Sequence, residues 1–238
     1  MSIVDLVKKD LRKFEDKKRA KNLSWFFKTE KGGYGEGDKF IGLKVPEARS
    51  VAKKYFDAMT LKDVADLLKS VYHEDRQVAL FILVYKFQKE TQGDQEKIFN
   101  LYVKNTGRIN NWDLVDCSAP YIVGPWLYSR DRSLLYKYAK SKNLWERRIA
   151  IISTAYFIRQ KDFRDTIKIC EILIKYSHDL IHKATGWMLR EVGNRDQKVL
   201  RGFLDQHLAA MPRTMLRYAI EKLPETIRLC YLKKPIKK

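Results

Sequence analysis

The chain has 238 residues, 45% of them hydrophobic, and carries 48 lysines and arginines against 29 aspartates and glutamates. The formal charge of +19 at pH 7 favours a polyanionic partner, either nucleic acid or an anionic membrane surface. No stretch approaches the ~18 to 20 uncharged apolar residues of a membrane span, so we expect no membrane insertion. The length suits one continuous domain over residues 1–238, and we expect a monomer.

Targeting, redox and metal signals are weak. The start, MSIVDLVKKDLRKF, breaks its apolar residues with charge too often for a signal peptide, so we expect a cytoplasmic protein. Cys117, Cys170 and Cys230 lie far apart without the close pairs of zinc sites, and we interpret them as small buried residues. His178 and His182 are interpreted as surface residues. Because neither a His-Glu-x-x-His motif nor a Gly-x-Ser-x-Gly elbow occurs, we expect no metal and no cofactor.

Apolar residues recur at three- and four-residue spacing along almost the whole chain, which predicts an all-α fold. Thr60 followed by Asp63 is typical of a helix start, and Pro46 suits a first helical turn. The expected helices span about 3–15, 18–28, 45–58, 61–71, 74–90, 93–105, 111–123, 131–141, 143–159, 162–176, 179–192, 197–209 and 213–222.

Short connections make neighbouring helices antiparallel, and helix pairs are expected every ~35 to 40 residues, as in HEAT-like arrays. We therefore predict a HEAT-like helical-repeat solenoid whose basic concave face fits a duplex. Four of the eleven glycines fall within residues 31–38, which lack a nucleotide-binding fingerprint and are interpreted as a connecting or DNA-contacting loop. The basic end of the chain, 233–238, is interpreted as a supplementary phosphate contact.

The expected helix at 111–123 places an indole beside a carboxylate. Trp112 and Asp116 are four residues apart and share a helix face, whereas Asp113 points elsewhere. The spacing alone leaves two interpretations, a functional pair or a core tryptophan beside a carboxylate with a structural partner.

Arg148 belongs to the packed side of its expected helix, on the row of Leu144 and Ile152. A guanidinium there needs a carboxylate or a phosphate, since an isolated buried charge is costly. A structural salt bridge, for which Asp116 is a plausible partner, and a DNA phosphate contact both remain open.

Lys183, Trp187 and Arg190 share one helix face by steps of four and three residues. Cations that hold phosphates and an indole that meets a base suit a nucleic-acid surface. The alternative is a core tryptophan flanked by cations whose stems cover it.

These segments resemble the AlkD family of bacterial alkylpurine DNA glycosylases. The similar strings are NNWDLVDCSAPYIVG at 110–124, LWERRIAIISTAYF at 144–157, IHKATGWMLREVG at 181–193 and PRTMLRYAIEKLP at 212–224, with GLKVPEAR at 42–49 similar to an early turn of the family. The resemblance implies a HEAT-like solenoid that releases 3-methyladenine and 7-methylguanine from double-stranded DNA, without full base extrusion and without a cofactor.

By this resemblance the catalytic aspartate falls on Asp116, the two cleft tryptophans on Trp112 and Trp187, and a DNA-contacting arginine on Arg148. A cleft aromatic falls on Phe26, where this chain departs from the family's tyrosine. Two other readings stay open, a non-catalytic helical-repeat protein that binds damaged or structured DNA, and a helical scaffold for proteins.

Overall fold

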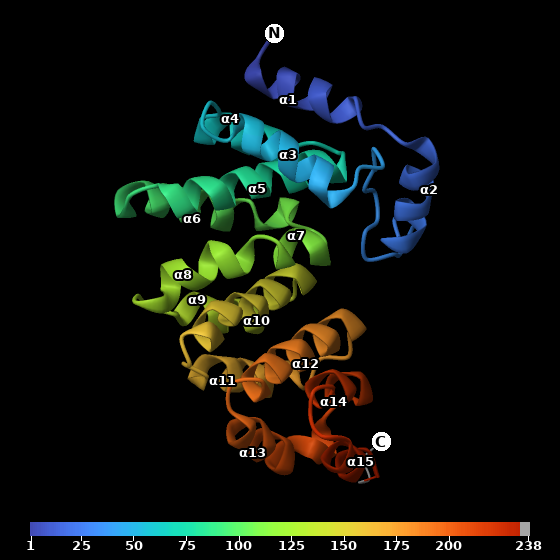
Figure 1. Ribbon diagram of the computed structural model, residues 1–238, viewed down its shortest axis with the longest axis vertical. Coiled ribbons are helices and arrows are strands. Elements are labelled where there is room, and N and C mark those ends of the chain that lie inside the picture. The colour runs from blue at the N-terminus through green and yellow to red at the C-terminus, as the bar shows by residue number, and fades with distance from the viewer. Residues whose placement is uncertain (234–238) are drawn as a thin grey trace. The chain divides into compact units, whose positions relative to one another are not determined.

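The computed structural model describes residues 1–233, and within them the chain is all-α, as predicted. The α-helices of Figure 1 are α1 Ile3–Arg12, α2 Lys17–Phe26, α3 Val45–Tyr55, α4 Leu61–Leu68, α5 His73–Lys89, α6 Gln92–Lys104, α7 Trp112–Asp116, α8 Val123–Tyr128, α9 Ser133–Ala139, α10 Leu144–Arg159, α11 Arg164–Leu173, α12 Asp179–Gly193, α13 Gln197–His207, α14 Arg213–Ala219 and α15 Glu225–Lys233. The predicted phosphate contact at 233–238 lies outside the described residues, except for Lys233.

Local sequence signals explain most helix starts. The Thr60 hydroxyl accepts the backbone N–H of Asp63, whose carboxylate bonds back to Thr60, so α4 begins with the capping box that the sequence indicated. Pro46 lies in the first turn of α3, where its missing N–H is not needed. None of the helices among residues 1–233 has the length and apolar character needed to cross a membrane.

The chain forms two compact units, Met1–Ile122 (unit 1) and Val123–Lys238 (unit 2). In unit 1, α5 packs against α3, α4 and α6, and its residues Val78, Leu80, Phe81, Ile82 and Leu83 are almost completely buried. That α5 is buried on all sides explains why it lacks a polar face over most of its length. A single domain over the whole chain stays a prediction.

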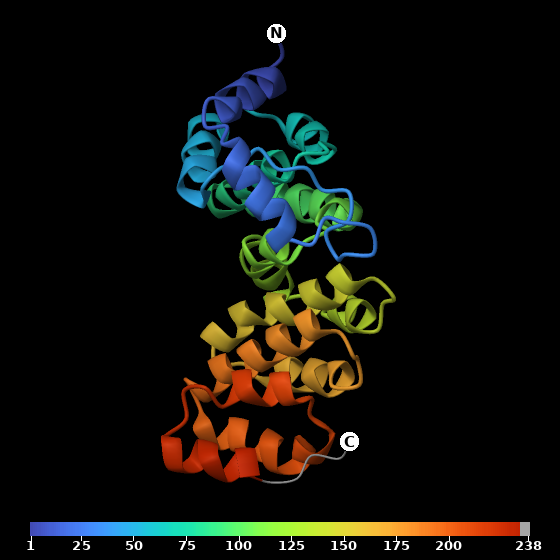
Figure 2. The ribbon, with the colours of Figure 1, turned by 90° about the vertical axis from the view of Figure 1, so that its right-hand side faces the viewer.

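In unit 2, α10, α12 and α14 lie side by side in both ribbon views (Figures 1 and 2), and each packs on the next. Two glycines permit a close approach between helices. A Cβ on Gly124 of α8 would lie 2.5 Å from the Ser153 carbonyl oxygen and 2.7 Å from the Tyr156 Cβ. On Gly186 of α12 it would lie 2.4 Å from the Met215 carbonyl oxygen and 2.6 Å from the Tyr218 Cβ.

The two contacts have the same form, since each glycine lies against a backbone carbonyl oxygen and a tyrosine Cβ of the neighbouring helix. The interval between Gly124 and Gly186 equals the interval between Tyr156 and Tyr218. It spans two helix pairs, so each helix pair takes roughly 31 residues. The prediction of a helical repeat is confirmed, but its expected spacing of ~35 to 40 residues is too long for unit 2.

The prediction of one continuous helix at 111–123 is wrong. The segment is divided into α7, a 3₁₀ turn at Ala119–Tyr121 and α8, with Pro120 in the 3₁₀ turn. Proline lacks an N–H and disfavours helix in the residue before it, and the Ser118 hydroxyl bonds the Leu114 carbonyl at 2.5 Å. The sequence analysis also missed α15.

Two further expectations about single residues fail. Cys230 is exposed, whereas Cys170 is buried as expected and Cys117 is half-buried. His182 is buried, because its Nε2 bonds the backbone carbonyl of Tyr176.

We predict that Gly186→Ala destabilises the protein. The new methyl group would meet a backbone oxygen and a Cβ, so α12 and α14 must separate, at a cost of about 1 to 3 kcal/mol. Gly202→Ala on α13 is the matched control, because nothing lies within 4 Å of its added Cβ, and helix propensity should stabilise it by up to about 1 kcal/mol. Urea unfolding measures both, and equal effects would contradict the tight contact.

Candidate functional site

The short helix α7 carries Trp112 at its first position and Asp116 at its last. Asn111 caps the helix, since its side-chain oxygen accepts the Trp112 backbone N–H at 2.8 Å. Both Trp112 and Asp116 are half-buried, so each presents part of its side chain to solvent. One helical turn therefore holds an indole and a carboxylate on a short, capped segment of unit 1.

An aromatic stack supports Trp112 from behind. Its ring stacks on Phe27 at 5.3 Å with an interplanar angle of 20° and meets the edge of Phe26 at 6.1 Å. Phe27 in turn stacks on Phe40 at 5.1 Å. Because Phe27 covers one face of the indole, a ligand that stacks on Trp112 would have to use the opposite face.

Sequence reasoning selected Phe26 and missed Phe27. The structure brings Phe26 into contact with Trp112, and its residue is 54% exposed, whereas Phe27 is only 6% exposed. Phe27 lies one residue past the end of α2, where helical periodicity no longer predicts which side a ring faces. Trp25, at 81%, is still more exposed than Phe26 and was also missed.

Behind the stack, His73 bridges two carboxylates. Its Nδ1 lies 3.0 Å from Asp38 Oδ2 and its Nε2 lies 2.8 Å from Asp113 Oδ2, with 2% of the His73 side chain exposed. Arg76 donates to Asp38 Oδ1 at 2.7 Å, and Gln77 donates to Asp113 Oδ2 at 3.0 Å. Sequence analysis found none of this cluster, because its members come from three segments distant in sequence.

The cluster raises the pKa of His73 to about 9. Burial opposes the positive charge, but the two carboxylates favour it more strongly, Asp113 through its charge and hydrogen bond and Asp38 through its hydrogen bond. The Asp38 pKa is lowered although burial opposes this, because His73 and Arg76 stabilise the carboxylate. The imidazole is therefore protonated at neutral pH.

The glycine-rich segment folds back onto the end of α2. The Gly35 N–H donates to the Lys28 carbonyl at 3.2 Å, and the Tyr34 hydroxyl donates to the Phe26 carbonyl at 3.1 Å. A Cβ on Gly35 would lie 2.3 Å from the Phe27 carbonyl oxygen, so no other residue fits there without a shift. The segment is a connecting loop that holds the aromatic residues beside Trp112.

In unit 2, the expected site residues lie on α10 and α12. Arg148 is 5% exposed and donates from Nη1 to the Leu180 carbonyl at 2.8 Å, so it links α10 to the first turn of α12. Trp187 is half-buried and directly follows Gly186 of the close helix contact.

The two remaining cations of α12 take part in ion pairs. Lys183 Nζ lies 2.7 Å from Asp179 Oδ2, and Arg190 pairs with Glu221. Lys183, Trp187 and Arg190 are all half-buried, which fits the shared helix face that their spacing indicated. The structure thus places Phe26, Trp112 and Asp116 in unit 1, and Arg148, Lys183, Trp187 and Arg190 in unit 2.

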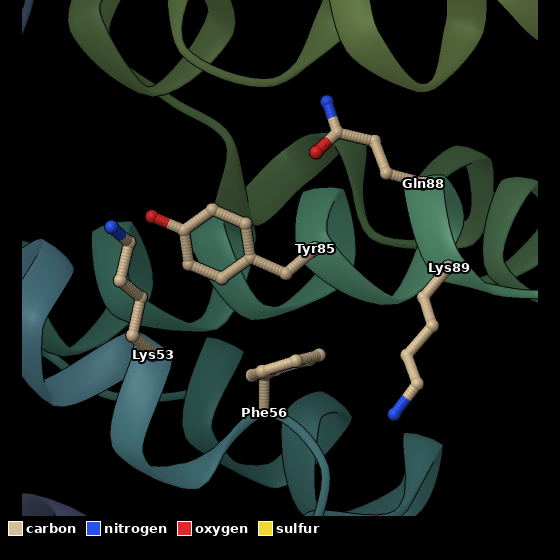
Figure 3. A pocket seen from close by; sticks show the side chains of 5 residues that line it. All are labelled: Lys53, Phe56, Tyr85, Gln88 and Lys89. Carbon is tan, nitrogen blue, oxygen red and sulfur yellow. The ribbon is translucent and has the colours of Figure 1, made fainter.

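A groove of about 440 Å³ in unit 1 lies elsewhere on the fold. Its lining residues are Lys53, Phe56, Tyr85, Gln88 and Lys89 from α3, its C-terminal end and α5 (Figure 3), and none of the expected site residues is among them. Among residues 1–233, no group of three or more His, Cys, Asp and Glu side chains is arranged to hold a metal ion.

Comparison with known proteins gives one family. Residues 7–223 match the family described as "DNA alkylation repair enzyme". The fold is similar to a solved structure described as "Predicted DNA alkylation repair enzyme from Enterococcus faecalis", with a TM-score of 0.70 and 14% identity over 89% of this chain and 97% of that one. At that identity the likeness shows a shared fold. Among curated proteins no sequence gives a significant match.

We predict that the stability of the protein falls as pH rises from 6.5 to above 9. Since the His73 pKa is higher in the folded than in the unfolded protein, its contribution is complete below pH 6.5 and is lost through pH 9, a difference of about 3 kcal/mol. Urea unfolding at both pH values measures it. His73→Gln should remove this dependence and His207→Gln, a control on α13, should keep it; equal dependence in both variants would refute the assignment.

Proposed function

Because the chain belongs to the DNA alkylation repair enzyme family, we propose that it is a DNA glycosylase for positively charged alkylated purines in duplex DNA, such as 3-methyladenine and 7-methylguanine. The observation that carries the proposal is the pair of Trp112 and Asp116 on α7, with one face of the indole covered by Phe27. The net charge of +19 supports a polyanionic substrate.

The chemistry requires one carboxylate. A cationic base is already a good leaving group, so the C1′–N bond breaks and its electron pair neutralises the base without protonation by an acid. Positive charge then develops on the sugar, where ionised Asp116 stabilises it by about 3 to 4 kcal/mol. A water molecule supplies the oxygen that bonds to C1′ and releases its proton to solvent.

Aromatic residues would contact the lesion. The face of Trp112 opposite Phe27 is proposed to contact the cationic base or its deoxyribose, a contact worth about 0.5 to 2 kcal/mol. Phe26, with its exposed ring beside Trp112, is proposed to contact the same nucleotide. In unit 2 we assign Trp187 the matching role. We include catalysis without full extrusion of the base in the proposal, as the resemblance implies.

Cations of unit 2 would bind the phosphate backbone. We assign this role to Arg148, Lys183 and Arg190, within a basic concave face that itself stays a prediction. The ion pairs of Lys183 and Arg190 are partly exposed and weak enough to be exchanged for phosphate contacts. That the protein is a monomer and lies in the cytoplasm are further parts of the proposal.

We predict that Asp116→Asn lowers 7-methylguanine release from a methylated duplex by more than about 100-fold, because it removes charge with little change of shape. Single-turnover release by metal-free protein measures the rate, with duplex affinity and the urea midpoint as controls for binding and folding. Unfolding of the variant would make Asp116 structural. Tight binding without release by the wild type would favour the non-catalytic DNA-binding alternative.

We predict that Lys183→Ala weakens duplex binding and reduces the slope of log affinity against log salt by about 1, because one phosphate contact is lost. Lys168→Ala on α11 removes the same charge from an exposed position outside the proposed surface and is the matched control. Titrations between 50 and 200 mM salt test this, about the range in which phosphate contacts dominate. An unchanged slope for Lys183→Ala would remove this residue from the surface.

A further inference from the structure

We propose that the buried bridge Asp38–His73–Asp113 is a positioning device that fixes α7, and with it Trp112 and Asp116, against the glycine-rich loop. The inference rests on the proposed function for the role of Asp116, but the bridge itself is a feature of unit 1. It makes His73 and Asp113 positioning residues, which act through α7 without touching the substrate.

The geometry requires a charged imidazole. An ionised carboxylate only accepts hydrogen bonds, whereas neutral imidazole has a single N–H to donate. Both ring nitrogens of His73 lie within hydrogen-bond distance of carboxylate oxygens, so both must donate, and the ring carries a positive charge. Arg76 is the other charged group of the cluster, and it bonds the far oxygen of Asp38.

The charges of the cluster balance. Asp38 and Asp113 supply two negative charges, and His73 and Arg76 supply two positive ones, all at side chains that are at most 16% exposed. Loss of the imidazolium would leave one buried carboxylate without its hydrogen bond from His73 and the cluster with a net negative charge, a change that is costly in low dielectric surroundings. Both hydrogen bonds of the bridge therefore form when His73 is protonated, and one of them is lost when His73 is neutral.

The bridge joins three segments of unit 1. Asp38 follows the glycine-rich loop, His73 begins α5, and Asp113 is the second residue of α7, one turn before Asp116. The backbone adds a second connection, since the His73 N–H donates to the Lys39 carbonyl at 2.8 Å.

The aromatic stack connects the same segments in parallel. Phe40, just after the loop, stacks on His73 at 4.6 Å, and Phe27 stacks on both Phe40 and Trp112. A shift of His73 would therefore displace both Asp113, through the hydrogen bond, and Trp112, through the aromatic stack. Displacement of a catalytic group by about 1 Å is enough to lower a rate about 100-fold.

A neighbouring carboxylate provides a matched control. Asp75 lies two residues after His73 in the first turn of α5 and is 0% exposed, but it pairs with Arg12 at 3.2 Å and accepts the Ser70 hydroxyl at 2.6 Å. None of these contacts involves α7. Asp75→Asn removes a buried charge of the same kind and should reduce stability without affecting base release.

The experiment compares wild type, His73→Gln, Asp113→Asn and Asp75→Asn. Single-turnover release of 7-methylguanine is measured from pH 7 to 9.5, with DNA alone as a blank, and duplex affinity is measured in parallel. Hydrogen exchange of residues 30–40 and 111–118 is followed in the same proteins without DNA.

We expect Asp113→Asn and His73→Gln to release base about 10- to 100-fold more slowly, a loss typical of groups that orient an active residue, with duplex affinity within about 3-fold of wild type. The ratio of the wild-type rate to the His73→Gln rate should fall as pH rises toward 9.5, a comparison in which the pH dependence of the substrate cancels. In both variants the two segments should lose exchange protection together, and Asp75→Asn should retain the protection and the rate.

Two results would overturn the inference. One is an equal loss of rate in Asp75→Asn and Asp113→Asn, since a general loss of stability would then explain both. The other is loss of protection at 30–40 in His73→Gln with 111–118 unchanged, because the bridge would then not hold α7. If wild type releases no base at any pH, the proposed function fails, and the exchange result alone decides the positioning role.

Discussion

A protonated histidine between two buried carboxylates is the interaction on which the candidate site of unit 1 depends. His73 ties the segment after the glycine-rich loop to α7, and the stack of Phe40, Phe27 and Trp112 follows the same route. A five-residue helix has too few internal hydrogen bonds to hold its own orientation. The precision with which Trp112 and Asp116 are held must therefore come from these tertiary contacts.

Most of the fold could be predicted because helix formation follows local apolar spacing. Apart from their ends, the expected helices match α1 to α6 and α9 to α14, and the family indicated by the strings around Trp112, Arg148 and Trp187 is confirmed. The helix expected at 111–123 failed because apolar spacing continues through it, while Pro120 and the Ser118 hydroxyl interrupt the hydrogen-bond ladder.

The candidate site could be predicted only in part. The spacing of Trp112 and Asp116 is local, and their common helix follows from it directly. Asp38 and His73 take part in contacts between segments 35 to 40 residues apart, and Phe27 stacks on a tryptophan still farther along the chain, separations for which local pattern carries no signal. The ion pair of Arg190 with Glu221 also joins α12 to the turn after α14, so a count of cations on one helix face overestimates the charge left for phosphates.

The repeated glycine contact of unit 2 also sets the position of the aromatic residue proposed to contact DNA in that unit. Tyr156, Trp187 and Tyr218 are separated by equal intervals, and all three are half-buried on successive helices α10, α12 and α14. Trp187 thus occupies the position at which the preceding and the following helix pair each carry a tyrosine. The repeat therefore places an aromatic side chain at the same level of each helix pair, and the indole of Trp187, with its ring N–H donor and larger face, differs chemically from the phenols on either side.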